Sequence, residues 1–299
     1  MTTNLSELSK PQIWILATRP KTLPAAAAPV VVGVAVAIGA GVFSFLPALA
    51  ALLGALLIQV GTNLANDVFD YKKGADTSER LGPTRVTQAG LLQPNEVMFG
   101  MIVAFGLSAL VGLYLVVVGG WPIILIGVLS IASGIAYTGG PFPLGYNGLG
   151  DLFVFVFFGP VAVGGTYYVQ ASQLSSTVLW ASVPIGLLAT AILVVNNLRD
   201  VDTDRKAGKR TLAVRLGAKG AQVEYIVLLI GAYLIPILMW GFGLTTIWAM
   251  LGWLSIPLAV KLIYMVLNEK GHPLNLALTG TAQLELLYAI LFSIGLAIG

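Results

Sequence analysis

Long apolar segments alternate with short polar segments along almost the whole chain. Stretches long enough for the roughly 20 residues that cross a bilayer lie at about 22–42, 47–66, 97–118, 121–138, 151–171, 178–197, 223–242, 246–266 and 281–298. This pattern predicts an all-α integral membrane fold, a bundle of nine transmembrane helices around a central cavity. No second domain is visible, so residues 1–299 are expected to form a single membrane-embedded domain.

The composition supports this reading and narrows the function. Apolar residues make up 57% of the chain and charged residues only 10%, whereas soluble domains contain about 25% charged residues. There is no cysteine, which excludes disulfides, thiolate metal sites and cysteine nucleophiles. The net charge of +3 suits contact with anionic lipid, and nucleic-acid binding is not indicated.

The positions of the basic residues predict the topology. With a cytoplasmic amino terminus, the inner segments are about 1–21, 67–96, 139–150, 198–222 and 267–280. Each of the 16 Lys and Arg residues then lies in an inner segment or, for Lys261, within two turns of one. This distribution predicts a cytoplasmic amino terminus, an external carboxy terminus and a multi-pass protein of the inner (cytoplasmic) membrane, with its basic face in the cytoplasm.

Two stretches rich in Asn and Asp stand out in this charge-poor chain. Residues 66–76 follow the second apolar segment, and residues 196–204 follow the sixth. Residues four apart share one face of a helix, so Asn66 with Asp70, and Asp200 with Asp204, present oxygen ligands suited to a hard cation. Because the Asn-x3-Asp pattern occurs in both stretches, we expect a pseudo-symmetric arrangement around one cavity.

A divalent cation is expected at these stretches because neighbouring carboxylates disfavour one another's ionisation. Mg²⁺ is the expected cofactor, since it combines one or two carboxylates with phosphate oxygens and water, and the sequence does not exclude Mn²⁺. The expected metal ligands are Asn66, Asp70, Asp76, Asn196, Asp200 and Asp204.

Basic side chains accompany both stretches and suit a ligand that carries a diphosphate. The candidate diphosphate-binding residues are Lys72, Lys73, Arg85, Arg199, Lys209 and Arg210. The alternative for each of these bases is a solvated residue of a positive-inside loop.

Four segments carry a resemblance to a known family: NDVFDYKKGAD, RLGPTRVTQAGLL, YTGGPFPLGYNGLGD and NNLRDVDTDRKAGKRTLAVRLG. Together they resemble the UbiA-type intramembrane aromatic prenyltransferases, and in particular the branch that acts on 1,4-dihydroxy-2-naphthoate in menaquinone and phylloquinone synthesis. The resemblance covers essentially the whole chain. It implies a nine-helix bundle that binds magnesium diphosphate at the cytoplasmic mouth of a cavity open sideways to lipid, with Asn66, Asp70, Asp200 and Asp204 at the metal-binding positions.

One position departs from the commoner superfamily pattern. Gly74 stands where that pattern has a third Asp, and the acid follows at Asp76, so the role of Asp76 stays open. The adjacent KKG and the lack of an RTxxRP continuation favour the naphthoate branch.

The resemblance implies transfer of a polyprenyl group from polyprenyl diphosphate to 1,4-dihydroxy-2-naphthoate, with loss of CO₂ and diphosphate, to give the demethylated quinone precursor. The residues expected to take part in catalysis are Asp67, Asp70, Asp200, Asp204 and Lys209. Tyr137 and Tyr146 are candidates for shielding the prenyl cation, or are ordinary interfacial aromatics. Asp151 is a candidate for orienting the acceptor, or caps a helix.

Several alternatives stay open at this point. Hydroxybenzoate and homogentisate are other possible acceptors, and a cation-coupled transporter is the competing class, because intramembrane acids also form ion pathways. The acids crowd the predicted inner ends rather than the membrane midplane, which favours the enzyme. The sequence does not indicate the prenyl chain length and saturation, the oligomeric state or the role of Glu285.

Overall fold

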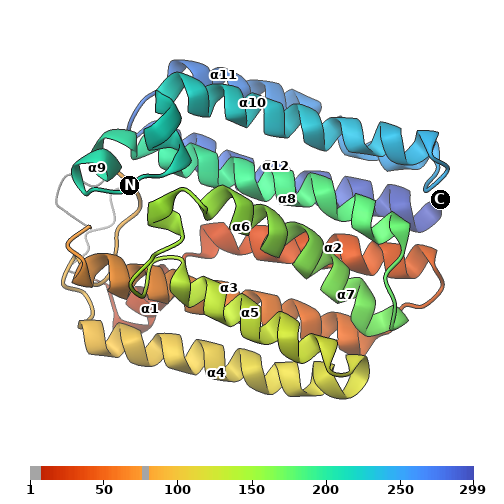
Figure 1. The fold of residues 1–299 in the computed structure, drawn as a ribbon, viewed down its shortest axis with the longest axis horizontal. Coiled ribbons are helices and arrows are strands. Elements are labelled where there is room, and N and C mark those ends of the chain that lie inside the picture. Colours follow the sequence, from red (N-terminus) through yellow and green to blue (C-terminus); the bar gives the residue numbers. More distant parts are fainter. Residues whose placement is uncertain (1–7, 76–80) are drawn as a thin grey trace.

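The computed structural model describes residues 8–75 and 81–299, and every regular element in these residues is helical. The longer helices are α2 (Leu23–Gly39), α3 (Phe45–Lys72), α4 (Pro94–Gly119), α5 (Pro122–Ala136), α8 (Ser176–Arg199), α10 (Leu212–Gly241), α11 (Ile256–Asn268) and α12 (Leu274–Ile298). The shorter elements are α1 (Lys10–Thr18), η2 (Pro20–Thr22), η3 (Gly145–Asn147), α6 (Gly150–Val156), η4 (Phe157–Val161), α7 (Ala162–Ala171), α9 (Val201–Lys206) and η5 (Ile247–Ser255). The long helices lie side by side along one common direction (Figure 1).

Eight helical stretches in the described residues are long and apolar enough to cross a membrane. Five are single helices, and three join consecutive elements: Lys10–Gly39, Gly150–Ala171 and Ile247–Asn268. The expected fourth span corresponds to α5, an apolar helix of 15 residues. The prediction of a multi-pass helical membrane protein is therefore confirmed, with one apolar helix shorter than expected.

Glycine and proline set several of the helix boundaries. Gly120 ends α4 with φ 75, and Pro122 occupies the first turn of α5, where its missing N–H costs no helical hydrogen bond. Gly217, with φ 73, interrupts α10 near its start. The predicted span at 151–171 is a composite, because a π-helical turn that contains Pro160 separates α6 from α7.

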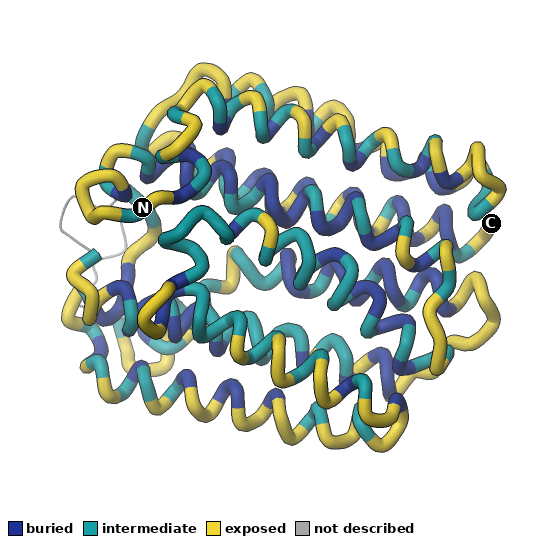
Figure 2. Tube along the Cα trace, viewed as in Figure 1, coloured by how far each residue is buried: buried dark blue, intermediate teal, exposed yellow. Residues whose placement is uncertain are grey.

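The best-buried helices lie in the middle of the bundle. Two thirds of the apolar window of α8 is buried (67%), compared with 28% for α4. Figure 2 shows the buried residues concentrated along α8, α12 and α2, while α4, α10 and α11 expose one face. In a membrane these exposed apolar faces contact lipid. Of the residues of α5, only Ile123 is buried.

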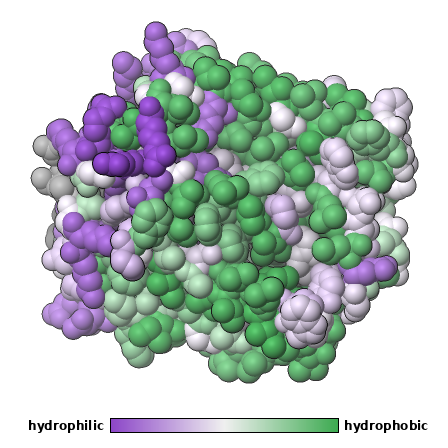
Figure 3. Space-filling view, viewed as in Figure 1, coloured by the Kyte–Doolittle hydropathy of each residue, from purple (hydrophilic) through white to green (hydrophobic). Residues whose placement is uncertain are grey.

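One end of the bundle is polar. Figure 3 shows hydrophilic residues gathered at the end that carries α9 in Figure 1, with hydrophobic residues over most of the remaining visible surface. The carboxyl ends of α3 and α8, which carry the two Asn/Asp-rich stretches, lie at this end (Figure 1).

Candidate active site

Asp70 lies on the last turns of α3 and is held from three directions. Its Oδ2 accepts a hydrogen bond of 2.8 Å from the Arg85 guanidinium, and its Oδ1 accepts one of 2.5 Å from the Tyr146 hydroxyl. The Lys209 Nζ lies 3.9 Å from the same Oδ1. Asp70 is only 2% exposed, and these partners compensate for the loss of water around its charge.

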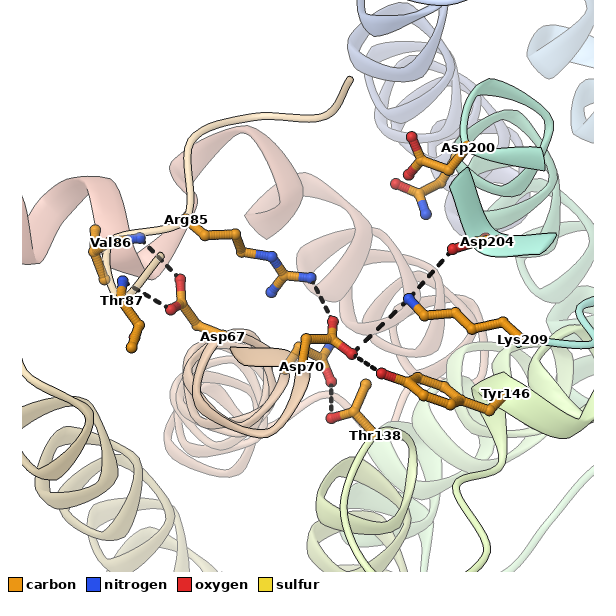
Figure 4. Close-up of polar contacts among 12 residues, drawn as sticks. Asp67, Asp70, Arg85, Val86, Thr87, Thr138, Tyr146, Asp200, Asp204 and Lys209 are labelled. Atoms are coloured by element: carbon orange, nitrogen blue, oxygen red, sulfur yellow. Dashed lines mark hydrogen bonds and ion pairs between the residues drawn. The ribbon is translucent and has the colours of Figure 1, made fainter. Parts of the chain in front are cut away.

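Lys209 joins the two Asn/Asp-rich stretches. Its Nζ lies 3.3 Å from Oδ1 of Asp204 in the second stretch, in addition to its contact with Asp70 in the first. Figure 4 shows the lysine side chain reaching between the two carboxylates. The expected convergence of both stretches on one site is therefore present in the structure.

Burial raises the pKa of the Asp204 carboxyl, and Asp200 and Asp70 act in the same direction, whereas the charge of Lys209 lowers it. The direction is that expected for an acid removed from water among other acids. Additional positive charge brought to the site would therefore stabilise the ionised form of Asp204.

The end of α8 carries a second set of polar contacts, centred on Arg199. Its guanidinium forms an ion pair with Asp200 and donates hydrogen bonds of 2.8 Å to the Asn196 and Asn275 side-chain oxygens. Asn275, at the start of α12, in turn donates to the carbonyl of Leu81. Arg199 thus ties α8 and α12 to the loop that follows the first stretch.

Asp67 has a different environment from Asp70. Its two oxygens accept 3.1 Å hydrogen bonds from the backbone N–H groups of Val86 and Thr87 (Figure 4). It is buried and does not line the cavity. This geometry makes Asp67 the anchor of the loop that carries Arg85, and gives no support to the catalytic role expected from the sequence.

Tyr146 packs among the bases of the site. The Lys209 ammonium lies 4.7 Å from the centre of its ring and the Lys73 ammonium 5.1 Å, within the range of cation–π attraction. Lys73 also donates to the carbonyls of Thr138 and Gly140. The ring of Tyr146 therefore already faces lysine cations, which fits positioning of Asp70 and Lys209 better than shielding of a prenyl cation.

The predicted residues divide into those that line one large cavity and those that do not. The lining residues are Asn66, Asp70, Arg85, Tyr137, Tyr146, Asn196, Asp200, Asp204 and Lys209. The residues away from the cavity wall are Asp67, Lys72, Lys73, Asp151, Arg199 and Arg210. Asp76 lies outside the described residues.

Three of the residues away from the wall show no contact suited to their expected role. Lys72 and Arg210 are exposed, and the backbone N–H of Arg210 donates to the Tyr146 carbonyl. Asp151 lies in the first turn of α6, and its Oδ1 has no hydrogen-bond partner among the described residues. Leu149 is the N-cap residue of α6 and no side chain caps this helix, so the expected capping role of Asp151 is not seen, although an acid in the first turn suits the helix dipole.

Polar residues of the cavity wall that were not singled out from the sequence include Gln59, Asn63 and Thr138. The Asn63 amide donates to the carbonyl of Thr18 and to the hydroxyl of Thr22, and the Thr138 hydroxyl donates to Asn66. Gln59 and Asn63 continue the face of Asn66 and Asp70 at helical spacing. The signal that could have indicated Gln59 and Asn63 is this stripe of polar residues inside an apolar span.

Glu285, on α12, is fully buried and does not line the cavity. Neither carboxyl oxygen has a hydrogen-bond partner in the described part of the chain. Glu285 therefore forms no hydrogen bond with Gln283, two positions earlier on α12, or with Lys261 on α11.

The whole cavity has a volume of about 600 Å³, and its wall below the polar mouth is mostly apolar. Its wall includes Ile58, Ile131, Phe153, Phe157 and Leu193. The site therefore combines a charged inner end with a water-poor chamber, an arrangement that fits an amphiphile with an anionic head and a long apolar tail.

The donor set at the mouth fits a hard divalent cation. No three acidic or histidine side chains cluster as a ready metal site in residues 8–75 and 81–299, and Lys209 and Arg85 form ion pairs with the carboxylates at the mouth. Mg²⁺ requires only one or two protein carboxylates when a phosphate group supplies further oxygens. Asp70, Asp200, Asp204 and the carboxamides of Asn66 and Asn196 provide oxygen donors around the same cavity.

The chain is similar to known proteins over nearly its full length. A model of the UbiA prenyltransferase family matches residues 26–293. A 1,4-dihydroxy-2-naphthoate octaprenyltransferase of Escherichia coli is 40% identical over 297 residues, which cover 97% of this chain and 96% of that protein. A Mycobacterium tuberculosis protein of the same name is 39% identical over 287 residues, covering 96% of this chain and 97% of that protein.

Solved structures share the fold at low sequence identity. A UbiA homologue from Archaeoglobus fulgidus, bound to GPP and Mg²⁺, aligns with a TM-score of 0.67 at 17% identity. The alignment covers 96% of this chain and 100% of that one. The arrangement of helices in the described residues is therefore that of this homologue.

Proposed function

Because the chain belongs to the UbiA prenyltransferase family, we propose that it transfers a polyprenyl group from a polyprenyl diphosphate to 1,4-dihydroxy-2-naphthoate. The products are diphosphate, CO₂ and the demethylated precursor of menaquinone or phylloquinone. The observation that carries the proposal is the meeting of both Asn/Asp-rich stretches around Lys209 at the mouth of an apolar cavity. The names of the bacterial relatives support the acceptor.

Mg²⁺ is the proposed cofactor, with Mn²⁺ as a possible substitute. Asp70, Asp200 and Asp204 would hold it, assisted by the carboxamides of Asn66 and Asn196. When bound, the metal neutralises charge on the diphosphate and so favours ionisation of the allylic C–O bond. The Mg²⁺ bound to the Archaeoglobus homologue supports this choice.

Lys209 and Arg85 are the proposed diphosphate-binding bases. Both line the cavity and both now contact Asp70, so they lie where the oxygens of a diphosphate would enter the acidic site. Positive charge at fixed positions stabilises the charge that grows on the leaving group. Asp67 acts indirectly, by holding the loop that carries Arg85.

The apolar chamber protects the prenyl cation from water. Tyr137, Phe153 of α6, and Phe157 and Phe158 of η4 line this chamber. Their ring faces suit a delocalised cation. The electron-rich ring of the acceptor forms the new C–C bond at its carboxylate-bearing carbon. The C–CO₂ bond then breaks and returns its electron pair to the ring, so no strong base is required at the attacked carbon.

We assign nine membrane spans to the protein, with α5 as the fourth, and treat residues 1–299 as one domain. The 16 Lys and Arg residues support a cytoplasmic amino terminus and an external carboxy terminus. This orientation puts the polar end of the bundle, and with it the active site, at the cytoplasmic face of the inner membrane.

The test is a reaction of the purified protein with Mg²⁺, octaprenyl diphosphate and one of three acceptors, followed by mass analysis of the products. We expect 1,4-dihydroxy-2-naphthoate to give a prenylated, decarboxylated product, and 4-hydroxybenzoate and homogentisate to react at least about tenfold more slowly. Preferential prenylation of either of the other acceptors would overturn the acceptor assignment.

A further inference from the structure

The cavity crosses the bundle obliquely. Near the polar end its wall includes the inner halves of α2, α8 and α12, for example Val30, Leu193 and Ala282. Toward the other end these three helices leave the wall, and α3, α4, α5 and α7 surround the cavity instead. Figure 1 shows that α4 and α5 lie on the opposite side of the bundle from α10 and α11. The outer section of this one cavity is therefore bounded by α3, α4, α5 and α7.

The depth of this outer section follows from residues on α3. The cavity wall runs along one face of α3 from Asp70 to Gly54 and beyond. These two residues are 16 positions apart in the sequence, which corresponds to about 24 Å along a helix. A Cβ atom added at Gly54 would lie 3.9 Å from Val111, so the neighbouring residue Gly112 on α4 is at a similar depth.

Gly127 on α5 reaches about the same level. A Cβ atom added at Gly134 would contact the Thr62 hydroxyl, so Gly134 lies beside Thr62 of α3. Gly127 lies two turns of α5 farther from the polar end than Gly134. A Cβ atom added at Gly112 or at Gly127 would meet nothing within 4 Å. Both glycines line the cavity, so both face open space.

The outer section is also accessible from the lipid side. Leu113, Ile124 and Val128 line the cavity and are 52% to 63% exposed. The surface over α4 and α5 is mostly hydrophobic (Figure 3). An apolar chain that enters this section is therefore not confined to the volume of the cavity and can continue into the bilayer.

We propose that the distal units of the polyprenyl donor occupy this outer section, and that the lack of side chains at Gly112 and Gly127 admits the longer donors. The inference rests on the proposed function. Three bonds of an extended peptide span roughly 3.5 Å, so one isoprene unit, with four main-chain bonds, spans roughly 4.7 Å. A chain that starts at Asp70 reaches the two glycines with about its fifth unit.

The test compares Gly112→Phe and Gly127→Phe with the wild type, using geranyl and octaprenyl diphosphates as donors to one acceptor. We expect kcat/KM for octaprenyl transfer to fall at least about tenfold, while geranyl transfer is unchanged, because two isoprene units end well before the glycines. Phenylalanine is better accommodated in a helix than glycine, and geranyl transfer itself reports on folding.

Gly106→Phe is the matched control. Gly106 is on α4, is exposed and does not line the cavity, and a Cβ atom added there also meets nothing within 4 Å. This variant is expected to use both donors as the wild type does. Unchanged octaprenyl transfer in the two cavity variants, or an equal loss with both donors, would overturn the inference. Failure of the wild type to transfer either chain would instead count against the proposed function.

Discussion

Lys209, in the segment that follows α9, places its Nζ 3.9 Å from Oδ1 of Asp70 on α3. The same ammonium lies 3.3 Å from Asp204, so one side chain just beyond the second Asn/Asp-rich stretch neutralises acids of both stretches. Like charges brought this close without it would repel one another. In the proposed function, Lys209 would exchange these carboxylate partners for phosphate oxygens when the metal and the diphosphate bind.

Replacing Asp70 by Asn is expected to lower prenyl transfer by about 100-fold or more, because it removes the carboxylate charge while it keeps the size of the side chain. The measurement is the initial rate with purified protein, with thermal unfolding as the check on folding. Asp202→Asn is the control, since the side chain of Asp202 is 85% exposed. Wild-type turnover by the Asp70→Asn protein would rule out the proposed role of Asp70.

Lys209→Met is expected to lower kcat by about 100-fold, because it removes a positive charge from the diphosphate site and leaves the carboxylates of Asp70 and Asp204 without the cation that they share. The exposed Lys219 provides the control variant, Lys219→Gln. Steady-state kinetics with both donor and Mg²⁺ varied would measure the effect. An equal, small loss in the two variants would show that Lys209 contributes only to the general positive charge of this face.

Asp67→Ala is expected to destabilise the protein by about 1–3 kcal/mol, since it leaves the backbone N–H groups of Val86 and Thr87 buried without acceptors. Activity should fall with it, because the same loop carries Arg85. The measurement is thermal unfolding in detergent beside the transfer rate. A variant that is inactive but as stable as the wild type would instead indicate a direct catalytic role for Asp67.

Removal of divalent metal is expected to stop the reaction, and added Mg²⁺ to restore it, because the diphosphate charge is then left without its main counterion. Dialysis against a chelator, followed by titration with Mg²⁺ or Mn²⁺ and measurement of the transfer rate, tests this. Transfer that continues undiminished in excess chelator would refute the metal assignment.

The dependence of Mg²⁺ binding on pH provides a separate check on Asp204. A proton competes with the cation for this carboxylate, and burial raises its pKa. Stabilisation of the protein by Mg²⁺ is therefore expected to weaken as the pH falls. The weakening should begin at a pH above about 4, the ordinary pKa of an Asp side chain. The measurement is the Mg²⁺-induced rise in Tm over a series of pH values. A rise that stays constant down to pH values near 4 would contradict a raised pKa.

The positions of the spans could be predicted because apolar runs of sufficient length have few alternatives in a bilayer. The window at 178–197 corresponds to α8 (Ser176–Arg199), and the window at 97–118 to α4 (Pro94–Gly119). Local backbone chemistry was harder to predict. The π-helical turn around Pro160 divides one predicted span, and α1 forms a separate short helix that ends at Arg19 with φ 52.

The residue types of the site were predictable, but not the direction of each side chain. Asn66 and Asp67 are adjacent on α3 and about 100° apart around the helix axis, so Asn66 lines the cavity while Asp67 binds the following loop. Arg199 and Lys209 are both basic residues in or near the second stretch, and the sequence does not distinguish them. Of the two, only Lys209 lines the cavity. Tertiary packing, which composition and spacing do not specify, makes this distinction.

The shortness of α5 has a consequence for the surrounding membrane. Its 15 residues span about 22 Å, several ångströms less than the roughly 30 Å hydrocarbon core of a typical bilayer. Hydrophobic mismatch of this kind is relieved by local thinning of the bilayer, and the exposed Trp121 just before α5 suits the interface at its end. The lipid beside the outer section of the cavity is therefore expected to be thinner than elsewhere around the protein.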